Sequence, residues 1–138
     1  MIKNEKQYNT TKKKLSELTE LINIEKLLST TSLQKELYYV SLINIQKQLQ
    51  TEIKIYLKKK RIGIALNKEI SVSRLPQVLI DYKISKKLSQ KDFSSILGIK
   101  EQQLQRYEMD KYASVSFKRL ISFVEKTDLK IMISVKKA

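Results

Sequence analysis

The stretch that decides the fold is Leu88-Ser-Gln-Lys-Asp-Phe-Ser-Ser-Ile-Leu-Gly-Ile-Lys-Glu-Gln-Gln-Leu-Gln-Arg-Tyr-Glu108. Ser89, with Asp92 three residues later, predicts a helix start, because the hydroxyl accepts from an orphan backbone N–H and a carboxylate is favoured at the positive end of a helix. Apolar residues then recur at three- and four-residue spacing, as expected of a helix that buries one stripe: Phe93, Ile96 and Leu97. Gly98 supplies the positive φ that ends this helix.

A second short helix is predicted after this turn, with Leu104 and Tyr107 on its inward face. Its outer face is then left with Glu101, Gln102, Gln105 and Arg106. Two short helices joined by a tight turn are the helix-turn-helix plan for reading a DNA major groove. A glutamine amide can donate to and accept from adenine, and an arginine guanidinium matches the two acceptors of guanine. An ordinary pair of amphipathic helices is the alternative, and the Gln- and Arg-rich outer face favours DNA reading over it.

The same residues resemble a known family. Ser89-Gln90 with Phe93, Leu97-Gly98 and Leu104 with Arg106-Tyr-Glu108 are similar to the phage-repressor-type, or XRE/Cro-like, helix-turn-helix family. The run Lys100-Glu-Gln-Gln-Leu-Gln-Arg-Tyr-Glu108 with Tyr112-Ala-Ser114 resembles a subgroup of bacterial regulators, the HigA- or HipB-like antitoxins. The resemblance covers roughly residues 74–135 and implies a λ-repressor-like helical domain.

The resemblance also implies roles for individual residues. Glu101, Gln102 and Arg106 face base edges, with Gln105 close by. Phosphates are held by the backbone N–H groups after Ser89 and by four side chains: Gln90, Lys100, Gln103 and Lys111. Met109-Asp-Lys111 departs from the Asn-Gly that many family members have, and Asp110 is the residue there that best tolerates positive φ.

Charge and composition bound the partners. The chain has 138 residues, with 28 Lys and Arg against 14 Asp and Glu and a net charge of +14. Residues 1–73 and residues 74–138 each carry half of this excess, which argues for a polyanionic partner. No segment approaches the roughly 20 apolar residues that span a bilayer, and the N-terminus has no apolar signal core, so we expect a cytoplasmic protein that binds no membrane.

An enzyme is hard to build from this composition. The sequence has no His and no Cys, so the usual metal ligand, general base and thiol nucleophile are all missing. Two glycines are too few for a phosphate-cradling loop. We expect a protein that is not an enzyme and that uses no cofactor and no metal.

Residues 1–61 predict an antiparallel helical hairpin. Apolar positions suit one amphipathic helix from Lys12 to Leu28 and a longer one from residue 31 to about residue 60, and the short connection folds the pair back. The inward stripe of the second helix is read as Leu37, Tyr38, Leu42, Ile45, Leu49, Ile53 and Tyr56. One pair of helices cannot cover both stripes, so we expect packing on the C-terminal domain or pairing with another chain.

The hairpin also predicts a basic end. Lys12-Lys-Lys14 should lie beside Lys58, Lys59, Lys60 and Arg61, where the three lysines 58–60 would contact phosphates that flank the site. The alternatives are an ordinary solvated face and, for the whole hairpin, a plain coiled-coil spacer or dimerisation element.

Residues 62–73 are read as a connector and residues 74–138 as the DNA-binding domain, with Pro76 in the first turn of its first helix. A last helix should begin at Ser114 or Ser116 and bury Phe117, Leu120, Ile121 and Val124. After it, apolar and polar residues alternate, which predicts a short β-strand. One strand needs a partner, so we expect pairing with its copy in a second subunit, or with a partner protein, through Leu129, Ile131, Ile133 and Val135. The alternative is a tail that lies on its own domain.

These observations predict a mainly α-helical, sequence-specific repressor that binds double-stranded DNA as a homodimer. An inverted-repeat operator would present its two major grooves about one turn, roughly 34 Å, apart. The family resemblance favours the antitoxin of a type II toxin–antitoxin module, which neutralises a HipA-like kinase or a RelE/HigB-like nuclease and regulates its own operon. A stand-alone or phage-derived regulator with no toxin uses the same parts.

Overall fold

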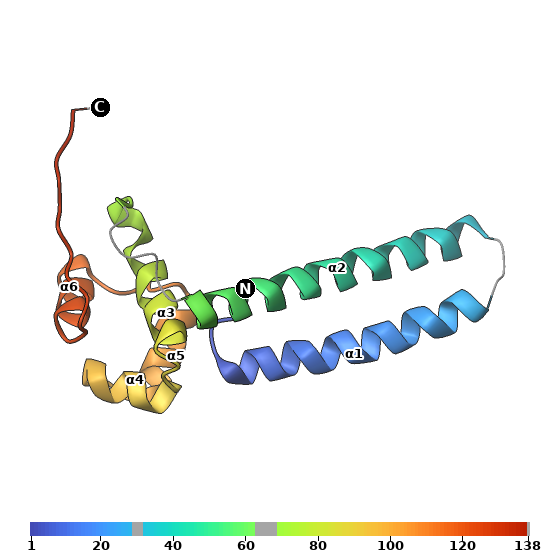
Figure 1. Ribbon diagram of the computed structural model, residues 1–138, viewed down its shortest axis with the longest axis horizontal. Coiled ribbons are helices and arrows are strands. Elements are labelled where there is room, and N and C mark those ends of the chain that lie inside the picture. The colour runs from blue at the N-terminus through green and yellow to red at the C-terminus, as the bar shows by residue number, and fades with distance from the viewer. Residues whose placement is uncertain (29–31, 63–68, 138) are drawn as a thin grey trace. The chain divides into compact units, whose positions relative to one another are not determined.

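The computed structural model describes residues 1–28, 32–62 and 69–137, and the chain divides into two compact units, Met1–Ile62 and Gly63–Ala138. The described residues are mainly helical, as predicted, and Figure 1 shows the element order. The hairpin unit consists of α1 (Glu5–Leu27) and α2 (Leu33–Ile62). The second unit consists of a 3-10 helix, η1 (Val72–Arg74), followed by α3 (Leu75–Ser85), α4 (Gln90–Leu97), α5 (Glu101–Met109) and α6 (Phe117–Glu125).

Helix α1 starts earlier than the sequence pattern suggested. Asn4 caps it by accepting a hydrogen bond of 2.8 Å from the backbone N–H of Gln7. Asn is among the best N-cap residues, and Glu5 follows in the first turn, where a negative charge is favoured. The predicted start at Lys12 is therefore wrong by seven residues, because Asn4 caps the helix and Glu5 begins it.

Three side-chain contacts fix the register of the antiparallel pair α1 and α2, which lie side by side in Figure 1. The rings of Tyr8 and Tyr56 stack with centroids 5.3 Å apart. The carboxylate of Glu5 accepts from the Tyr56 hydroxyl at 2.9 Å and from the Lys60 ammonium at 2.8 Å. Burial, and then the hydrogen bond to Glu5, raises the pKa of Tyr56.

This register corrects the predicted basic end. Lys60 lies opposite Glu5, so the lysines from Lys12 to Lys14 lie about 10 Å further along the hairpin, at a rise of ~1.5 Å per residue. Lys58–Lys60 and Lys12–Lys14 therefore share one half of the hairpin but not its end.

The inward face of α2 differs from the prediction. Leu42 and Tyr56 are buried, whereas Leu37, Tyr38 and Ile45 are exposed. The helix carries apolar residues around much of its circumference between Leu37 and Ile45. A single partner helix covers only one side, and periodicity alone does not say which side that is.

The second unit encloses its core on several sides. Side chains from three helices are fully buried: Leu79, Ile80, Phe93, Leu97 and Leu104. The rings of Tyr82 and Phe93 lie 6.1 Å apart, and those of Tyr112 and Phe123 lie 6.5 Å apart. The short helices α4 and α5 are therefore seated on a closed apolar core.

The last helix begins where one of the two predicted caps stands. Ser116 accepts from the backbone N–H of Arg119, and α6 starts at Phe117. Leu120 and Val124 are buried as predicted. Phe117 is exposed, because it is the first residue of α6 and lies at the end of the helix, outside the buried part of its apolar face.

The predicted C-terminal strand does not form within residues 129–137. These residues are extended and without strand pairing, and most of their side chains are exposed, Val135 by 96%. Figure 1 shows this segment as a plain trace that leads away from α6. The prediction of a strand at Leu129, Ile131, Ile133 and Val135 is wrong for the single chain, because a strand needs a second strand to bond with and the described part of the chain offers none.

Within the described ranges no helix has the length and apolar character needed to cross a membrane. Of the predicted connector, residues 63–68 lie outside the described residues, and the later part contains η1.

Candidate nucleic-acid interface

The first helix of the predicted reading pair, α4, begins with a complete capping box. The Asp92 carboxylate accepts from the Ser89 hydroxyl at 2.6 Å. The Ser89 hydroxyl oxygen accepts from the backbone N–H of Asp92 at 3.0 Å, and the Asp92 carboxylate accepts from the backbone N–H of Ser89 at 3.4 Å. Both orphan donors at the helix start are thus engaged locally. The predicted helix start at Ser89 is confirmed.

Gly98 makes the turn between α4 and α5, as predicted, with φ 67° and ψ 38°. These angles lie in the left-handed region, which residues with a Cβ adopt only at a cost. The ammonium of Lys126, from the residue after α6, donates to the carbonyl oxygen of Leu97 at 2.8 Å. A lysine from the end of the domain thus satisfies a carbonyl at the end of α4.

The outer face of α5 is open. Glu101, Gln102, Gln105 and Arg106 are all exposed, whereas Leu104 is fully buried. The Gln105 amide donates to the Glu101 carboxylate at 3.4 Å, one helical turn away. The structure therefore brings the four predicted base-reading residues together on one surface, with hydrogen-bonding groups directed away from the core.

The residues predicted to hold phosphates are in different situations. Lys100 and Lys111 are exposed, and Lys100, at the N-cap of α5, makes no side-chain cap. The Gln103 amide donates to the Tyr107 hydroxyl at 2.7 Å. The Ser89 hydroxyl is engaged in the capping box. Within the helix-turn-helix unit, Lys100 and Lys111 are thus the most available of the predicted phosphate ligands. At Ser89, only the backbone N–H groups that follow it remain as predicted phosphate donors.

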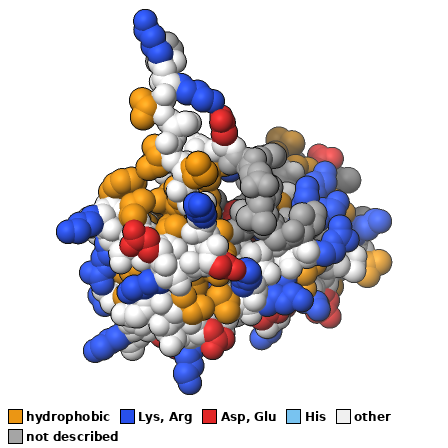
Figure 2. Space-filling view, turned by 60° about the vertical axis from the view of Figure 1, so that its left-hand side comes forward, with side chains coloured by type: hydrophobic (Ala, Val, Ile, Leu, Met, Phe, Trp, Pro, Cys, Tyr) orange, Lys and Arg blue, Asp and Glu red, His pale blue; other side chains and the backbone are white. Residues whose placement is uncertain are grey.

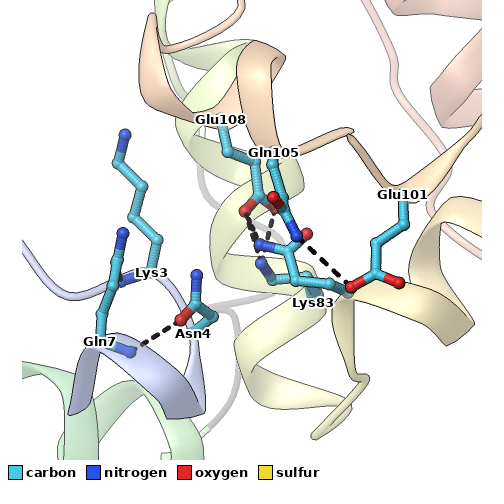
Figure 3. Close-up of polar contacts among 8 residues, drawn as sticks. Lys3, Asn4, Gln7, Lys83, Glu101, Gln105 and Glu108 are labelled. Atoms are coloured by element: carbon cyan, nitrogen blue, oxygen red, sulfur yellow. Dashed lines mark hydrogen bonds and ion pairs between the residues drawn. The ribbon is translucent and has the colours of Figure 1, made fainter. Parts of the chain in front are cut away.

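Gln90 belongs to a buried network that the sequence analysis missed. The ammonium of Lys83 in α3 donates to both carboxylate oxygens of Glu108 in α5, at 2.6 and 2.7 Å (Figure 3). The Gln90 amide donates to the same carboxylate at 2.8 Å. The side chains of Lys83 and Glu108 are only 1% and 3% exposed. This network ties α3, α4 and the end of α5 together, and it occupies the amide that was predicted to reach a phosphate.

The sequence does carry a signal for this ion pair. Lys83 lies four residues after Leu79, and Glu108 lies four residues after Leu104, so each charged residue falls on the buried face of its helix. Two opposite charges placed on inward faces predict a buried pair, since an unpaired buried charge is costly.

The loop after α5 is held by an aromatic anchor. Positive φ values occur at Lys111 (55°) and Tyr112 (62°), and Asp110, the predicted site, has φ −89°. The prediction of positive φ at Asp110 is therefore wrong. The ring of Tyr112 is buried and its backbone N–H donates to the Tyr107 carbonyl, and these two contacts fix the backbone conformation of the loop. The hydrogen bond from Ser114 to the Asp110 carboxylate lowers the pKa of Asp110.

The lysines of the hairpin unit differ in availability. Lys58 is exposed, Lys59 is half-buried, and Lys60 forms an ion pair with Glu5 at 2.8 Å. Phosphate binding by Lys58–Lys60 stays a prediction, in which Lys58 has the freest ammonium of the three.

Positive charge is widespread on the molecule. Figure 2 shows many Lys and Arg side chains on the face that it presents, interspersed with a few acidic ones. Among the described residues no group of three or more His, Cys, Asp or Glu side chains is placed to hold a metal ion.

The comparison with protein families agrees with this geometry. Residues 79–132 match the family model described as helix-turn-helix, so the second unit contains an XRE-type helix-turn-helix domain, the class of domain found in DNA-binding regulators. The match begins in α3 and extends past α6. No curated protein and no solved structure gives a significant match to the chain.

Proposed function

We propose that this protein is a sequence-specific transcriptional repressor that binds an inverted-repeat operator as a homodimer. The observation that carries the proposal is the open face of α5, where Glu101, Gln102, Gln105 and Arg106 lie together on a domain of the helix-turn-helix family. Two such helices related by a two-fold axis would meet major grooves one helical turn, about 34 Å, or a multiple of it apart.

The charge supports the same proposal. A net charge of +14 favours a polyanion and gives a large salt-dependent contribution that does not depend on base sequence. Sequence preference then has to come from base contacts, and Arg106 has the chemistry for guanine while Gln102 and Gln105 have the chemistry for adenine.

The test is Arg106→Ala, measured by fluorescence anisotropy on an operator selected from random duplexes and on arbitrary DNA. We expect a loss of about 1–3 kcal/mol on the operator and much less on arbitrary DNA, because a bidentate base contact is lost. Lys130→Ala, an exposed cation of the C-terminal residues, is the control and should weaken both duplexes little. Equal losses on the two DNAs for Arg106→Ala would mean that Arg106 contacts only phosphate.

The hairpin lysines have their own test. The slope of log affinity against log salt is negative, and changing Lys58, Lys59 and Lys60 to Ala should reduce its magnitude by ~0.9 for each phosphate contact removed. The matched control changes Lys12, Lys13 and Lys14 to Ala, which removes the same charge from the other helix. If both triple variants keep the parental slope, the hairpin does not touch DNA and acts as a spacer or interaction element.

A second candidate function is the neutralisation of a toxin, with DNA binding used for autoregulation. It is favoured by the resemblance of the run from Lys100 to Glu108, together with Tyr112, to HigA- and HipB-like antitoxins. Co-expression with the product of the adjacent gene tests it. A stable complex with a kinase or nuclease that loses its toxicity would support the antitoxin role, and the absence of a complex would leave a stand-alone regulator.

A further inference from the structure

The hairpin exposes an apolar surface on α2 that its partner helix does not cover. Five large side chains, each between 47% and 73% exposed, make up what we call the α2 patch: Leu33, Leu37, Tyr38, Val40 and Ile45. Leu27 and Leu28, at the end of α1, are exposed as well. A contiguous apolar surface of this size on a small protein marks an interaction site.

The local sequence shows that this part of α2 is built for burial on more than one side. From Leu37 to Gln46 there is no charged residue, and apolar side chains occur on successive turns in several directions. A helix that is apolar all round is typical of a core position. Helix α1 buries Leu42. Leu33, Leu37 and Val40 lie on the opposite side of α2 and remain exposed, and Tyr38 and Ile45, which flank Leu42, are about half exposed.

Charge identifies the kind of partner. Residues 33–45 carry one lysine and one glutamate and are neutral as a set, whereas residues 46–61 carry six basic residues against one acidic residue. Two copies of a chain with a net charge of +14 repel one another, and the neutral patch is the part of α2 where they can meet at the least electrostatic cost. A nucleic acid or an anionic membrane would instead prefer the basic half.

We propose that the α2 patch is a homodimer interface, in which α2 of one copy packs antiparallel against α2 of a second copy about a two-fold axis near Ser41. In this arrangement the basic stretches around Lys60 lie about 30 Å from the axis on opposite sides, given a rise of ~1.5 Å per residue. Their separation far exceeds the Debye length of about 8 Å at physiological salt. Parallel packing would place the two basic stretches together.

The available area is sufficient for such a pair. At roughly 100 Å² for each partly exposed side chain of this size, the patch offers on the order of 500 Å² per copy. A two-fold pair that covered all five side chains would bury at most about 1,000 Å², which is the lower bound for a specific interface. The proposal concerns the hairpin, and its test contains no DNA. A dimeric parent that is insensitive to Leu37→Glu would overturn this interface and leave the proposed function standing, whereas a monomeric parent would count against the homodimer in both proposals.

The first experiment compares two substitutions on one face of α2. Leu37 and Ile55 are 18 residues apart, which is five full turns, so they point the same way, and they are 63% and 44% exposed. Sedimentation of the full chain should show the parent at twice its mass of 16.2 kDa. Leu37→Glu should raise the dimer dissociation constant by about 100-fold or more, because each dimer would bury two unpaired carboxylates.

Ile55→Glu is the matched control and should sediment as the parent does. Because both sites are exposed and Glu is a good helix former, circular dichroism should show unchanged helix content for both variants. A parent that is monomeric over the accessible concentration range, or a Leu37→Glu variant that remains as dimeric as the parent, would overturn the proposal.

A second experiment keeps the apolar patch intact. The chain has no cysteine, so Ser41→Cys and Thr51→Cys each introduce a single exposed thiol on α2. In the antiparallel pair the two copies of position 41 face each other, whereas those of position 51 lie about 30 Å apart. A short bismaleimide should therefore link Ser41→Cys into covalent dimers and leave Thr51→Cys monomeric on a denaturing gel. Linking of both variants, or of neither, would overturn the antiparallel arrangement.

Discussion

The hairpin unit and the helix-turn-helix unit carry the same charge but are stabilised in different ways. Residues 1–62 hold 13 Lys and Arg against 6 acidic residues, and residues 63–138 hold 15 against 8, so each has a net charge of +7. The helix-turn-helix unit closes its core on several sides and contains a buried ion pair. The hairpin buries one side of each helix and uses a half-exposed ion pair between Glu5 and Lys60.

The difference shows that net charge does not distinguish the helix-turn-helix unit from the hairpin unit. What distinguishes them is which face is left open. In the helix-turn-helix unit the open face of α5 is polar, with Gln102, Gln105 and Arg106, and suits base edges. In the hairpin the open face of α2 is apolar, with Leu33 and Leu37, and suits another protein surface.

The largest expected effect on stability is the loss of the buried Lys83–Glu108 ion pair, compared with the loss of the more exposed Glu5–Lys60 pair. Lys83→Met should lower the free energy of unfolding of the helix-turn-helix unit by about 3–5 kcal/mol, because Glu108 would remain buried without its cation. Lys60→Met should cost less than about 1 kcal/mol, since the side chains of Lys60 and Glu5 are 31% and 54% exposed. Urea denaturation followed by circular dichroism measures both.

The control for this pair of variants is the double substitution Lys83→Met with Glu108→Leu. Removing both charges should restore most of the lost stability, because no buried charge is then left unpaired. Equal losses for Lys83→Met and Lys60→Met would contradict the distinction between a closed unit and an open one.

An intermediate effect is expected at the turn between α4 and α5. Gly98→Ala should cost about 1–2 kcal/mol, because a residue with a Cβ would have to adopt φ 67°. The added Cβ would also lie 3.2 Å from the Lys126 ammonium and would disturb its bond to Leu97. Gly98→Asn should cost less, since Asn tolerates this region better. Thermal melting ranks the two variants, and equal losses would show that backbone conformation is not the cause.

A smaller effect is expected from acid on the hairpin. The hydrogen bond from Lys60 holds the pKa of Glu5 below its ordinary value of 4.5. Because the folded-state pKa is the lower one, this contribution is present above pH 4.5 and is lost as the pH falls through the folded-state value. The parent should be more stable than Glu5→Gln at pH 5, by less than about 1 kcal/mol in free energy of unfolding. This difference should disappear as the pH falls below the folded-state pKa of Glu5. Parallel melts of both proteins across this range measure the difference, and a constant difference would show that the Glu5 charge contributes nothing.

The smallest effect is expected at Tyr112. Its hydroxyl is buried and has no hydrogen-bond partner among the described residues. Tyr112→Phe removes an unsatisfied polar group and keeps the ring, so the free energy of unfolding should be unchanged or slightly higher. Tyr56→Phe, which removes a hydroxyl bonded to Glu5, is the comparison and should cost about 0.5–1.5 kcal/mol. Chemical denaturation measures the free energy of unfolding of both variants, and a larger loss for Tyr112→Phe than for Tyr56→Phe would contradict the prediction.

The predictable part of this molecule is local. Ser89, Asp92 and Gly98 mark the start of α4 and the turn after it through residue chemistry that acts over three or four positions, and the structure places all three as predicted. The open face of α5 follows from the same periodicity.

The unpredicted part depends on partners that are distant in the sequence. The Lys83–Glu108 pair joins residues 25 positions apart, and the side that α2 presents to α1 is ambiguous because Leu37 and Leu42 are equally apolar. The prediction of a C-terminal strand was wrong for a related reason. An alternating pattern indicates that a segment can form a strand, but the strand forms only where another strand pairs with it.

The network of Lys83, Gln90 and Glu108 has a consequence for the thermodynamics of recognition. It fastens the C-terminal end of α5 to the two preceding helices, while Gly98 fixes the approach to its N-terminal end. In the proposed complex, a helix anchored in this way would meet the groove already formed, so no ordering of α5 would have to accompany association. The heat capacity change of operator binding should then scale with interface burial alone, without the added signature of coupled folding.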